Sequence, residues 1–353
     1  MMIQETNGKD EREARSAGFM EHVIEGSWPD FHGVISSAER FVLSSHINPD
    51  GDAVGSALAL KRLLHQMGKD AWWVMDKPLS YNYDSFYQPG ELLVFENGDL
   101  DFSSREVVIM TDAGFWNRLG DVGVVLAQHP GVKMCIDHHP PYDPFEGWKL
   151  VDTSAPSTTV LIYRYLQFLG KEMTLELAEP IYLGLIVDTQ NFHLPNTTVE
   201  AHQIAAHCLE VGVDPTRVYE PIFANNRFSR LRLMSEAFHT LQVICGGKVS
   251  VMYTTREMFE KCESQYGEDE GFSDLVRTIE RVSVGIYLRE EPNGRVKVSW
   301  RARNCNNVEL SARKFGGGGH IRAAGALIRG SLEEVRQRVI EDIQQRVEQG
   351  EIE

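Results

Sequence analysis

The sequence predicts an α/β protein of two domains: an N-terminal domain whose mostly parallel sheet carries helices on both faces, and a smaller C-terminal α/β domain. Three observations lead to this prediction. The chain has 353 residues, which is long for one hydrophobic core and suits two. Its first half alternates short apolar runs with segments of helical periodicity, which is the pattern of βαβ units. Its second half changes to strand-like runs joined in part by a hairpin turn.

Four short runs in the first half are rich in β-branched or aromatic residues and predict buried strands, at residues 41–45, 71–75, 107–111 and 132–136. Apolar residues at helical spacing predict helices at residues 53–67, 157–169, 180–187 and 199–211. The first two helices are each followed by a glycine, which is a favoured residue just beyond a helix end. The third begins with Pro180 and is apolar throughout, as expected of a buried helix.

The second half is predicted to contain strands at residues 249–253, 282–288 and 296–300. The last two are joined by Pro292-Asn293-Gly294, a hairpin turn sequence. Helices are predicted at residues 228–243, 255–266, 273–279 and 331–348. The last of these opens with Ser331 and Glu334, the spacing of a capping box.

Composition limits the classes of function. No apolar run reaches the roughly 18–20 residues of a membrane-spanning helix, and the polar N-terminus does not resemble a secretory signal. Five scattered cysteines without a CxxC pair argue against disulfides and thiolate zinc sites, so we expect a cytoplasmic protein. The net charge of -16 argues against binding of duplex DNA.

One part of the chain departs from this acidic balance. Between residues 295 and 322 there are seven basic residues against a single acidic one, Glu309. A local basic region in an acidic protein favours a small anionic ligand, although a solvated charged surface is the alternative for any one of these residues. The seven are Arg295, Lys297, Arg301, Arg303, Arg313, Lys314 and Arg322.

Carboxylates and histidines follow three of the predicted strands. His46, Asp50 and Asp52 follow the first, Asp112 the third, and Asp137-His138-His139 the fourth, while Asp188 follows the apolar helix 180–187. Ligands of open α/β sheets bind beyond the carboxyl ends of the strands, so these side chains are expected to converge on one crevice. Each cluster alone fits a turn or cap equally well. Their joint occurrence predicts a metal site.

The mixture of ligand types indicates which metals fit. Several carboxylates in one crevice repel each other unless cations neutralise them. Carboxylate and imidazole ligands together suit first-row divalent ions such as Mn²⁺. Two such ions about 3.5–4 Å apart can activate a water and clamp a phosphoryl group. Asp112 stands between the other clusters and is the natural bridge.

These motifs, together with the segment KFGGGGHIRAAGA at residues 314–326, resemble the DHH phosphoesterase superfamily with its glycine-rich C-terminal nucleotide-binding domain. The resemblance runs from about Phe41 to Ala326. The polar, charged N-terminus predicts a mobile tail at residues 1–30. The chain is then expected to divide into a catalytic metal-binding domain at 31–195, a helical connection at 196–240 and a substrate-binding domain at 241–346. The active-site cleft is expected between the two domains.

The resemblance also implies roles for the clustered residues. His46 and Asp50 are expected to hold one metal, Asp52 and His138 the other, with Asp112 bridging and Asp188 completing the second site. His139 is expected to contact the scissile phosphate or protonate the leaving oxygen. Asp137 is expected to orient a neighbouring histidine. The two ions are expected to be Mn²⁺, with Co²⁺ and Mg²⁺ as alternatives.

Substrate contacts are expected from both domains. Ser157 and Thr158 match a family Ser-Thr pair at a helix start, where they contact a phosphate or simply cap the helix. Arg301 matches the arginine with which the family grips a terminal phosphate. Gly317, Gly318, Gly319 and His320 are expected to form a backbone anion-binding loop, with a flexible linker as the alternative. The chain departs from the family at Gln190, where a glycine is usual, and at Ala302, where a serine is common.

The implied function is hydrolysis of very short RNAs or dinucleotides to mononucleotides, of adenosine 3′,5′-bisphosphate (pAp) to AMP and phosphate, or of both. An inorganic pyrophosphatase, a cyclic-dinucleotide phosphodiesterase and a non-catalytic nucleotide-binding module are the alternatives. The acidic net charge argues against a processive exonuclease with a long basic channel. A homodimer is expected from the resemblance alone.

Overall fold

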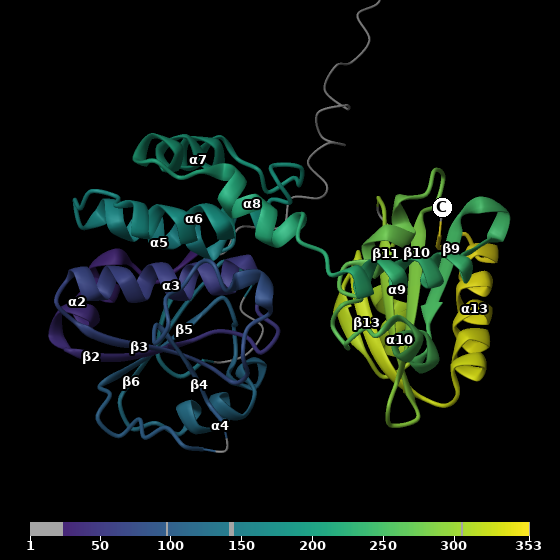
Figure 1. The fold of residues 1–353 in the computed structure, drawn as a ribbon, viewed down its shortest axis with the longest axis horizontal. Coiled ribbons are helices and arrows are strands. Elements are labelled where there is room, and N and C mark those ends of the chain that lie inside the picture. Colours follow the sequence, from purple (N-terminus) through teal and green to yellow (C-terminus); the bar gives the residue numbers. More distant parts are fainter. Residues whose placement is uncertain (1–23, 97, 141–144, 305, 353) are drawn as a thin grey trace, which may run out of the picture. The chain divides into compact units, whose positions relative to one another are not determined.

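The computed structural model describes residues 24–96, 98–140, 145–304 and 306–352 (Figure 1). The chain divides into two compact units, one ending at Asn225 and the other beginning at Asn226. This boundary lies inside the stretch expected as a helical connection. Residues 1–23 of the expected mobile tail lie outside the described residues. Residues 24–30 are not a tail, because they form strand β1 (Ile24–Glu25) and the start of helix α2 (Trp28–Ser37).

The first unit is built on a seven-stranded sheet in which all neighbours are parallel except β1 and β7. This confirms the predicted α/β fold. Across the sheet the strands are β1, β7 (Trp148–Asp152), β6 (Val132–Asp137), β5 (Val107–Thr111), β2 (Arg40–Ser44), β3 (Asp70–Met75) and β4 (Leu92–Val94).

Side chains of the central strands alternate between two apolar cores, as the two-residue period of a strand requires. Leu43 and Ile109 face the larger core, beneath α3 (Gly51–Gln66), α5 (Thr158–Phe168) and α6 (Leu175–Asp188). Val42 and Val108 face the opposite core, which α4 (Asp121–Ala127) covers. Figure 1 shows α3 and α4 on opposite faces of the sheet. Both faces of the strands are therefore buried, which explains their continuous apolar sequences.

Helix α6 begins at Leu175, so the prediction that it starts at Pro180 is wrong. A proline inside a helix leaves the carbonyl four residues earlier without its N–H partner. Here that carbonyl belongs to Glu176, and the Arg62 guanidinium donates a 2.9 Å hydrogen bond to it. A side chain from α3 therefore compensates the interruption and lets the helix run through Pro180. Two further helices, α7 (Val199–Val211) and α8 (Pro215–Phe223), complete the first unit.

The second unit is built on a six-stranded sheet in which only β9 and β10 are parallel. The hairpin at Pro292-Asn293-Gly294 is confirmed, since Glu291 pairs with Arg295. Helix α13 (Leu332–Glu348) covers one face and begins with the predicted capping box. The strands in spatial order are β12 (Gly318–His320), β13 (Ala323–Arg329), β11 (Arg295–Ala302), β10 (Val284–Glu291), β9 (Val249–Thr254) and β8 (Gln242–Ile244).

The opposite face of this sheet is covered by α9 (Phe228–His239), α10 (Arg256–Cys262) and α11 (Phe272–Leu275). The helix predicted to run from 228 to 243 is too long. It ends at His239, beyond which the Thr240 hydroxyl lies within hydrogen-bonding distance of the carbonyls of Ala237 and Tyr253 and the chain enters β8. Within the described ranges, no helix is both long and apolar enough to cross a membrane.

Candidate metal centre

The predicted metal ligands of the first unit meet at one edge of the parallel sheet. Strands β2, β5 and β6 are neighbours, and His46, Asp112 and His138 follow their carboxyl ends. Asp50 caps the first turn of α3, and Asp52 lies within that turn. Asp188 is the last residue of α6. Neighbouring parallel strands thus bring residues far apart in sequence to the same edge, as expected for an α/β sheet.

Three groups of side chains in this cluster have potential ligand atoms within 4.8 Å of one another. The first contains His46, Asp50 and Asp112, and the second Asp52, His138 and Asp188. The third joins Asp112 to His138 and His139. Asp112 therefore belongs to the first and third groups, and it lies beside the second group through His138. Its Oδ2 lies 3.6 Å from His46 Nε2, and its Oδ1 lies 3.8 Å from His138 Nε2.

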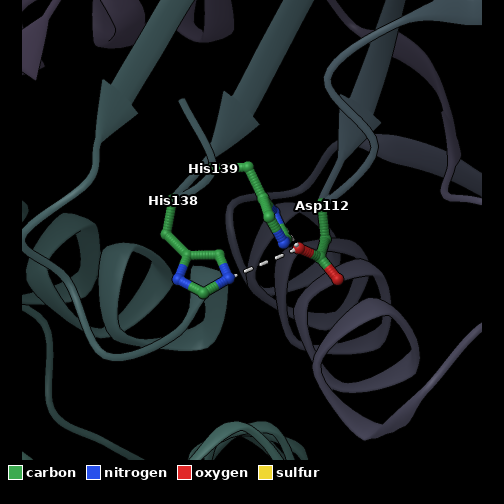
Figure 2. Close-up of side chains that lie close together, drawn as sticks. All are labelled: Asp112, His138 and His139. Carbon is green, nitrogen blue, oxygen red and sulfur yellow. Dashed lines mark ion pairs between the residues drawn. The ribbon is translucent and has the colours of Figure 1, made fainter. Parts of the chain in front are cut away.

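Figure 2 shows the imidazoles of His138 and His139, on the loop after β6, beside the carboxylate of Asp112. His138 Nδ1 donates to the carbonyl of Ala155 at 3.2 Å, which directs Nε2 towards the cluster. That Nε2 lies 3.0 Å from Asp188 Oδ2, yet it is buried without a partner of hydrogen-bonding geometry. A buried imidazole nitrogen with its other nitrogen fixed by a carbonyl is typical of a metal ligand. The donor set therefore fits divalent ions of the Mn²⁺ type.

Asp52 is held by backbone rather than by side chains. Its carboxylate accepts hydrogen bonds from the N–H groups of Thr158 (2.6 Å) and Thr159 (2.9 Å), the first residues of α5. A helix N-terminus presents unpaired N–H groups and a partial positive charge, so it stabilises a carboxylate there. These bonds fix one face of the cluster to the start of α5.

Ser157 and Thr158 are fully buried, with 0% of their surface exposed. The Ser157 hydroxyl accepts from the N–H of Val160 and so caps α5. The Thr158 hydroxyl donates to Asp112 Oδ1 at 3.2 Å. The alternative of a helix cap holds for Ser157, and contact of this pair with substrate stays a prediction.

His139 faces two carboxylates. Its Nδ1 lies 2.8 Å from Asp137 Oδ1 and 3.2 Å from Asp112 Oδ1. Asp137 also accepts from the backbone N–H of His139 at 2.9 Å. The His139 side chain remains 36% exposed, whereas the side chain of Asp137 is buried. The structure thus pairs Asp137 with His139, and its role in orienting that histidine stays a prediction.

The packed charges shift the pKa values of the metal-free cluster. Burial, with Asp188 and Asp112 nearby, raises the pKa of Asp52 well above its usual value. Burial also raises the pKa of Asp188, to about 6, against the opposing effect of His138. Burial alone would raise the pKa of Asp112, but the neighbouring imidazoles of His139 and His46 outweigh it and hold the pKa far below its usual value.

The pKa values of the two neighbouring histidines are raised, whereas burial alone lowers the pKa of an imidazole. Burial alone lowers the pKa of His138, but the nearby Asp188 carboxylate overcomes this and raises the pKa to about 10. For His139 the bonds to Asp112 and Asp137 likewise overcome burial and raise the pKa to about 11. Both shifts favour the protonated imidazoles, as expected beside several carboxylates.

Glycines allow α3 and α6 to approach closely around the cluster, which sequence analysis missed. A Cβ on Gly184 would lie 2.6 Å from Asp52 Oδ1 and 2.4 Å from the Thr159 methyl. A Cβ on Gly55 would lie 2.3 Å from the carbonyl of Pro180. Gly184 cannot be identified from the sequence alone, because a glycine within an apolar helix has no distinguishing pattern.

The remaining predicted residues form a separate group in the second unit. Arg301 pairs with Ala323, which pairs in turn with His320, so the three form one row across β11, β13 and β12. Residues paired in register share a face of the sheet, so Arg301 and His320 flank the small Ala323. Arg301 Nε also lies 3.4 Å from Asp274.

The glycine-rich segment is an exposed edge strand rather than a flexible linker, since Gly318, Gly319 and His320 pair with β13. A Cβ on Gly317 would lie 2.1 Å from the carbonyl of Gly325. Gly319 has a φ of +141° and a similarly close neighbour, the carbonyl of Ala323 at 2.6 Å. Both positions therefore require glycine for close backbone approach.

Two domain families match the chain. Residues 40–185 match the DHH family, N-terminal domain, and residues 267–349 match the DHHA1 domain. The chain is 32% identical over 308 residues to the bifunctional oligoribonuclease and PAP phosphatase NrnA of Thermus thermophilus. That alignment covers 86% of this chain and 89% of the relative.

Solved structures share the fold. The crystal structure of an exopolyphosphatase-related protein from Bacteroides fragilis superposes with a TM-score of 0.85 at 25% identity, covering 93% of this chain and 98% of that one. RecJ from Thermus thermophilus, in complex with Mn²⁺, has a TM-score of 0.56 at 13% identity, covering 90% of this chain and 55% of that chain. The two-domain α/β architecture is common to these proteins.

Proposed function

Because the chain belongs to the DHH family, we propose that it is a two-metal phosphoesterase that hydrolyses very short RNAs to mononucleotides and pAp to AMP and phosphate. Dependence on divalent metal is a property of the family, and Mn²⁺ is the ion we propose here. The name of the 32% identical NrnA relative supports both substrates. We further propose a cytosolic location, in keeping with free thiols at the four cysteines that the structure describes.

One observation carries the proposal: Asp112 lies within ligand distance of two groups, one with His46 and Asp50, the other with His138. A carboxylate with one oxygen towards each group is suited to bridge two cations. His46 and Asp50 would hold one ion; Asp52, His138 and Asp188 would hold the other. Bound there, the ions would activate a water for attack and stabilise charge on the phosphoryl oxygens.

The protein's own groups then have separable tasks. The N-terminal N–H groups of α5 keep Asp52 oriented, and Ala155 keeps His138 Nε2 directed at the cluster. His139 would act as the general acid, because its Nδ1 is held by carboxylates and its ring is partly exposed. Its Nε2–H is then free to donate a proton to the leaving oxygen.

The row of Arg301, Ala323 and His320 is the proposed site for the far end of the substrate. A planar guanidinium suits a terminal phosphate, and Ala323 leaves room beside it. The exposed backbone of Gly318 and Gly319 would add N–H donors for an anion. A homodimer remains part of this proposal.

The test is hydrolysis by the purified full chain with Mn²⁺. The substrates are pAp, pGpG, a five-nucleotide RNA, cyclic di-AMP and pyrophosphate, each also assayed with Asp112→Asn. Asparagine is chosen because Asp112 has a φ of +52°, which asparagine tolerates. Loss of a group that only orients a ligand costs about 10–100-fold, so loss of a bridging ligand should cost more than about 100-fold.

The outcomes separate the alternatives. Turnover of pAp and short RNA that disappears in Asp112→Asn supports the proposal. Turnover of pyrophosphate alone would identify a pyrophosphatase, and turnover of cyclic di-AMP alone a cyclic-dinucleotide phosphodiesterase. Absence of turnover with Mn²⁺, Co²⁺ and Mg²⁺ would leave a nucleotide-binding module.

A further inference from the structure

The segment that follows Asp188 has an unusual backbone. Gln190, Asn191 and Phe192 have φ angles of +46°, +57° and +64°, so three consecutive residues other than glycine are left-handed. Such conformations cost about 1–3 kcal/mol each and persist where surrounding contacts hold them. The turn is closed by hydrogen bonds from the N–H groups of His193 and Leu194 to the carbonyl of Thr189. The structure therefore constrains the chain tightly just beyond a proposed metal ligand.

Asn196 connects this turn to the start of α5. Its Nδ2 donates to the carbonyl of Asp188 at 3.1 Å and to the carbonyl of Pro156 at 3.0 Å. The side-chain amide has two N–H donors, and both are used. Its Oδ1 is buried without a hydrogen-bond partner. The opposite orientation of the amide would set Oδ1 against two carbonyl oxygens, so the two donors determine the orientation.

The two carbonyls belong to the segments that supply the second ligand group. Asp188 carries a carboxylate 3.0 Å from His138. Pro156 immediately precedes Ser157, the N-cap of α5, and the first turn of α5 holds Asp52. Asn196 thus ties the backbone of one proposed ligand to the helix end that orients another.

We propose that Asn196 is a positioning residue that sets the geometry of the Asp52, His138 and Asp188 group, and through it the affinity for one of two metal ions. The inference rests on the proposed two-metal function. It assigns Asn196 no contact with metal or substrate. Its loss should therefore weaken one metal site selectively, while the group of His46, Asp50 and Asp112 keeps its geometry.

A purely stabilising role is the competing explanation, and a matched control separates the two. The buried His129 side chain also bridges two backbone groups, at 3.0 Å from the carbonyl of Phe102 and 3.0 Å from the N–H of Gly131. It lies before β6, at the opposite end of the strand from His138. His129→Ala should lower the melting temperature without changing Mn²⁺ binding.

The experiment is calorimetric titration of the metal-free full chain with Mn²⁺, for wild type, Asn196→Ala and His129→Ala. Wild type should bind two ions. Asn196→Ala should bind one with unchanged affinity and the other about 10–100-fold more weakly, as for other residues that orient metal ligands. Its kcat should recover at high Mn²⁺ while its KM for substrate stays within about twofold. Electron paramagnetic resonance of bound Mn²⁺ should report loss of coupling between ions at low metal concentration.

Three results would overturn the inference. If Asn196→Ala lowers the melting temperature as His129→Ala does but binds both ions within about twofold of wild type, Asn196 is only structural. If wild type itself fails to bind two ions, the proposed function fails first and the inference with it. Should Asn196→Ala not fold, Asn196→Ser retains one donor and is titrated instead, and unchanged affinity at both sites in that variant also counts against the inference.

Discussion

The backbone N–H of Thr158 donates a 2.6 Å hydrogen bond to Oδ2 of Asp52, across 106 positions of sequence. The N–H of Thr159 donates a second hydrogen bond, of 2.9 Å, to Oδ1 of the same carboxylate. Asp52 is therefore oriented by a helix end rather than by another titrating side chain. Burial and the neighbouring carboxylates Asp188 and Asp112 nevertheless raise the pKa of Asp52. A cation is the group that would resolve this conflict.

Two roles for His139, general acid and metal ligand, can be distinguished by comparing kcat with Mn²⁺ affinity. We expect His139→Asn to reduce kcat by about 10²–10⁴-fold, as for loss of a general acid, with a small change in KM. The Mn²⁺ affinity of both sites should stay close to that of wild type. Steady-state kinetics and calorimetry on the same preparation test this. If one Mn²⁺ site is lost in parallel with kcat, His139 is a ligand, as its place beside Asp112 would allow.

Metal binding should release protons and strengthen as pH rises. In the metal-free protein the pKa of His138 is raised to about 10, so the imidazole is protonated at neutral pH and must lose a proton to bind metal. Below pH 6, Asp188 also carries a proton that metal must displace. Calorimetry in buffers of different ionisation enthalpy measures the release. Binding without proton release and independent of pH between 6 and 8 would contradict the description of His138.

Gly184→Ala should weaken metal binding, although Gly184 is not a proposed ligand. The added methyl would lie 2.6 Å from Asp52 and 2.4 Å from Thr159, so α6 or Asp52 must move. We expect a loss of about 1–3 kcal/mol in the free energy of unfolding, as for other overpacked positions, and weaker Mn²⁺ binding.

Gly33→Ala in α2 is the matched control, because a Cβ there meets nothing within 4 Å. It should stabilise the protein by about 0.5–1 kcal/mol through helix propensity and leave Mn²⁺ binding unchanged. Chemical denaturation and metal titration of both variants provide the comparison. Equal effects of the two substitutions would refute the close-contact explanation.

Gln190→Gly should raise stability without changing the site. Gln190 has a φ of +46°, which a side chain disfavours by about 1–2 kcal/mol and glycine adopts freely. Glycine costs about 0.5–1 kcal/mol more conformational entropy on folding, so we expect a net gain of about 0–1.5 kcal/mol in the free energy of unfolding. Urea denaturation measures it, with Mn²⁺ affinity as the second readout. A clear loss of stability would mean that the Gln190 side chain makes a compensating contact.

The parallel strands that carry the ligands could be predicted from sequence because both of their faces are buried, and Val107–Thr111 was located to the residue. Strand β7 was missed, since the sequence of Trp148–Asp152 mixes apolar and charged residues and its pairing depends on β6 and β1. The start of α6 was missed because local rules place proline at a helix start, whereas Arg62 satisfies the freed carbonyl from another helix.

The convergence of the ligand residues could likewise be predicted, because carboxyl ends of parallel strands share one edge. The residues around them could not. Thr158 acts through its backbone N–H and its bond to Asp112, Gly184 through the absence of a side chain, and Asn196 through two carbonyls. Each of these roles depends on a neighbour that is distant in the sequence, which periodicity and composition do not reveal. The assignment of ligands to particular ions remains a prediction.

The backbone anchoring of Asp52 has a consequence for how this protein tolerates genetic change. An N–H group survives replacement of its own side chain, so the bond to Asp52 does not itself require threonine at position 159. The Thr159 hydroxyl has a separate 2.7 Å hydrogen bond with Ser157. Gly184 is constrained more strongly, because any side chain there would collide with the Asp52 carboxylate. Substitutions should therefore be tolerated better at some residues that contact the carboxylates through the backbone than at Gly184, which carries no functional group.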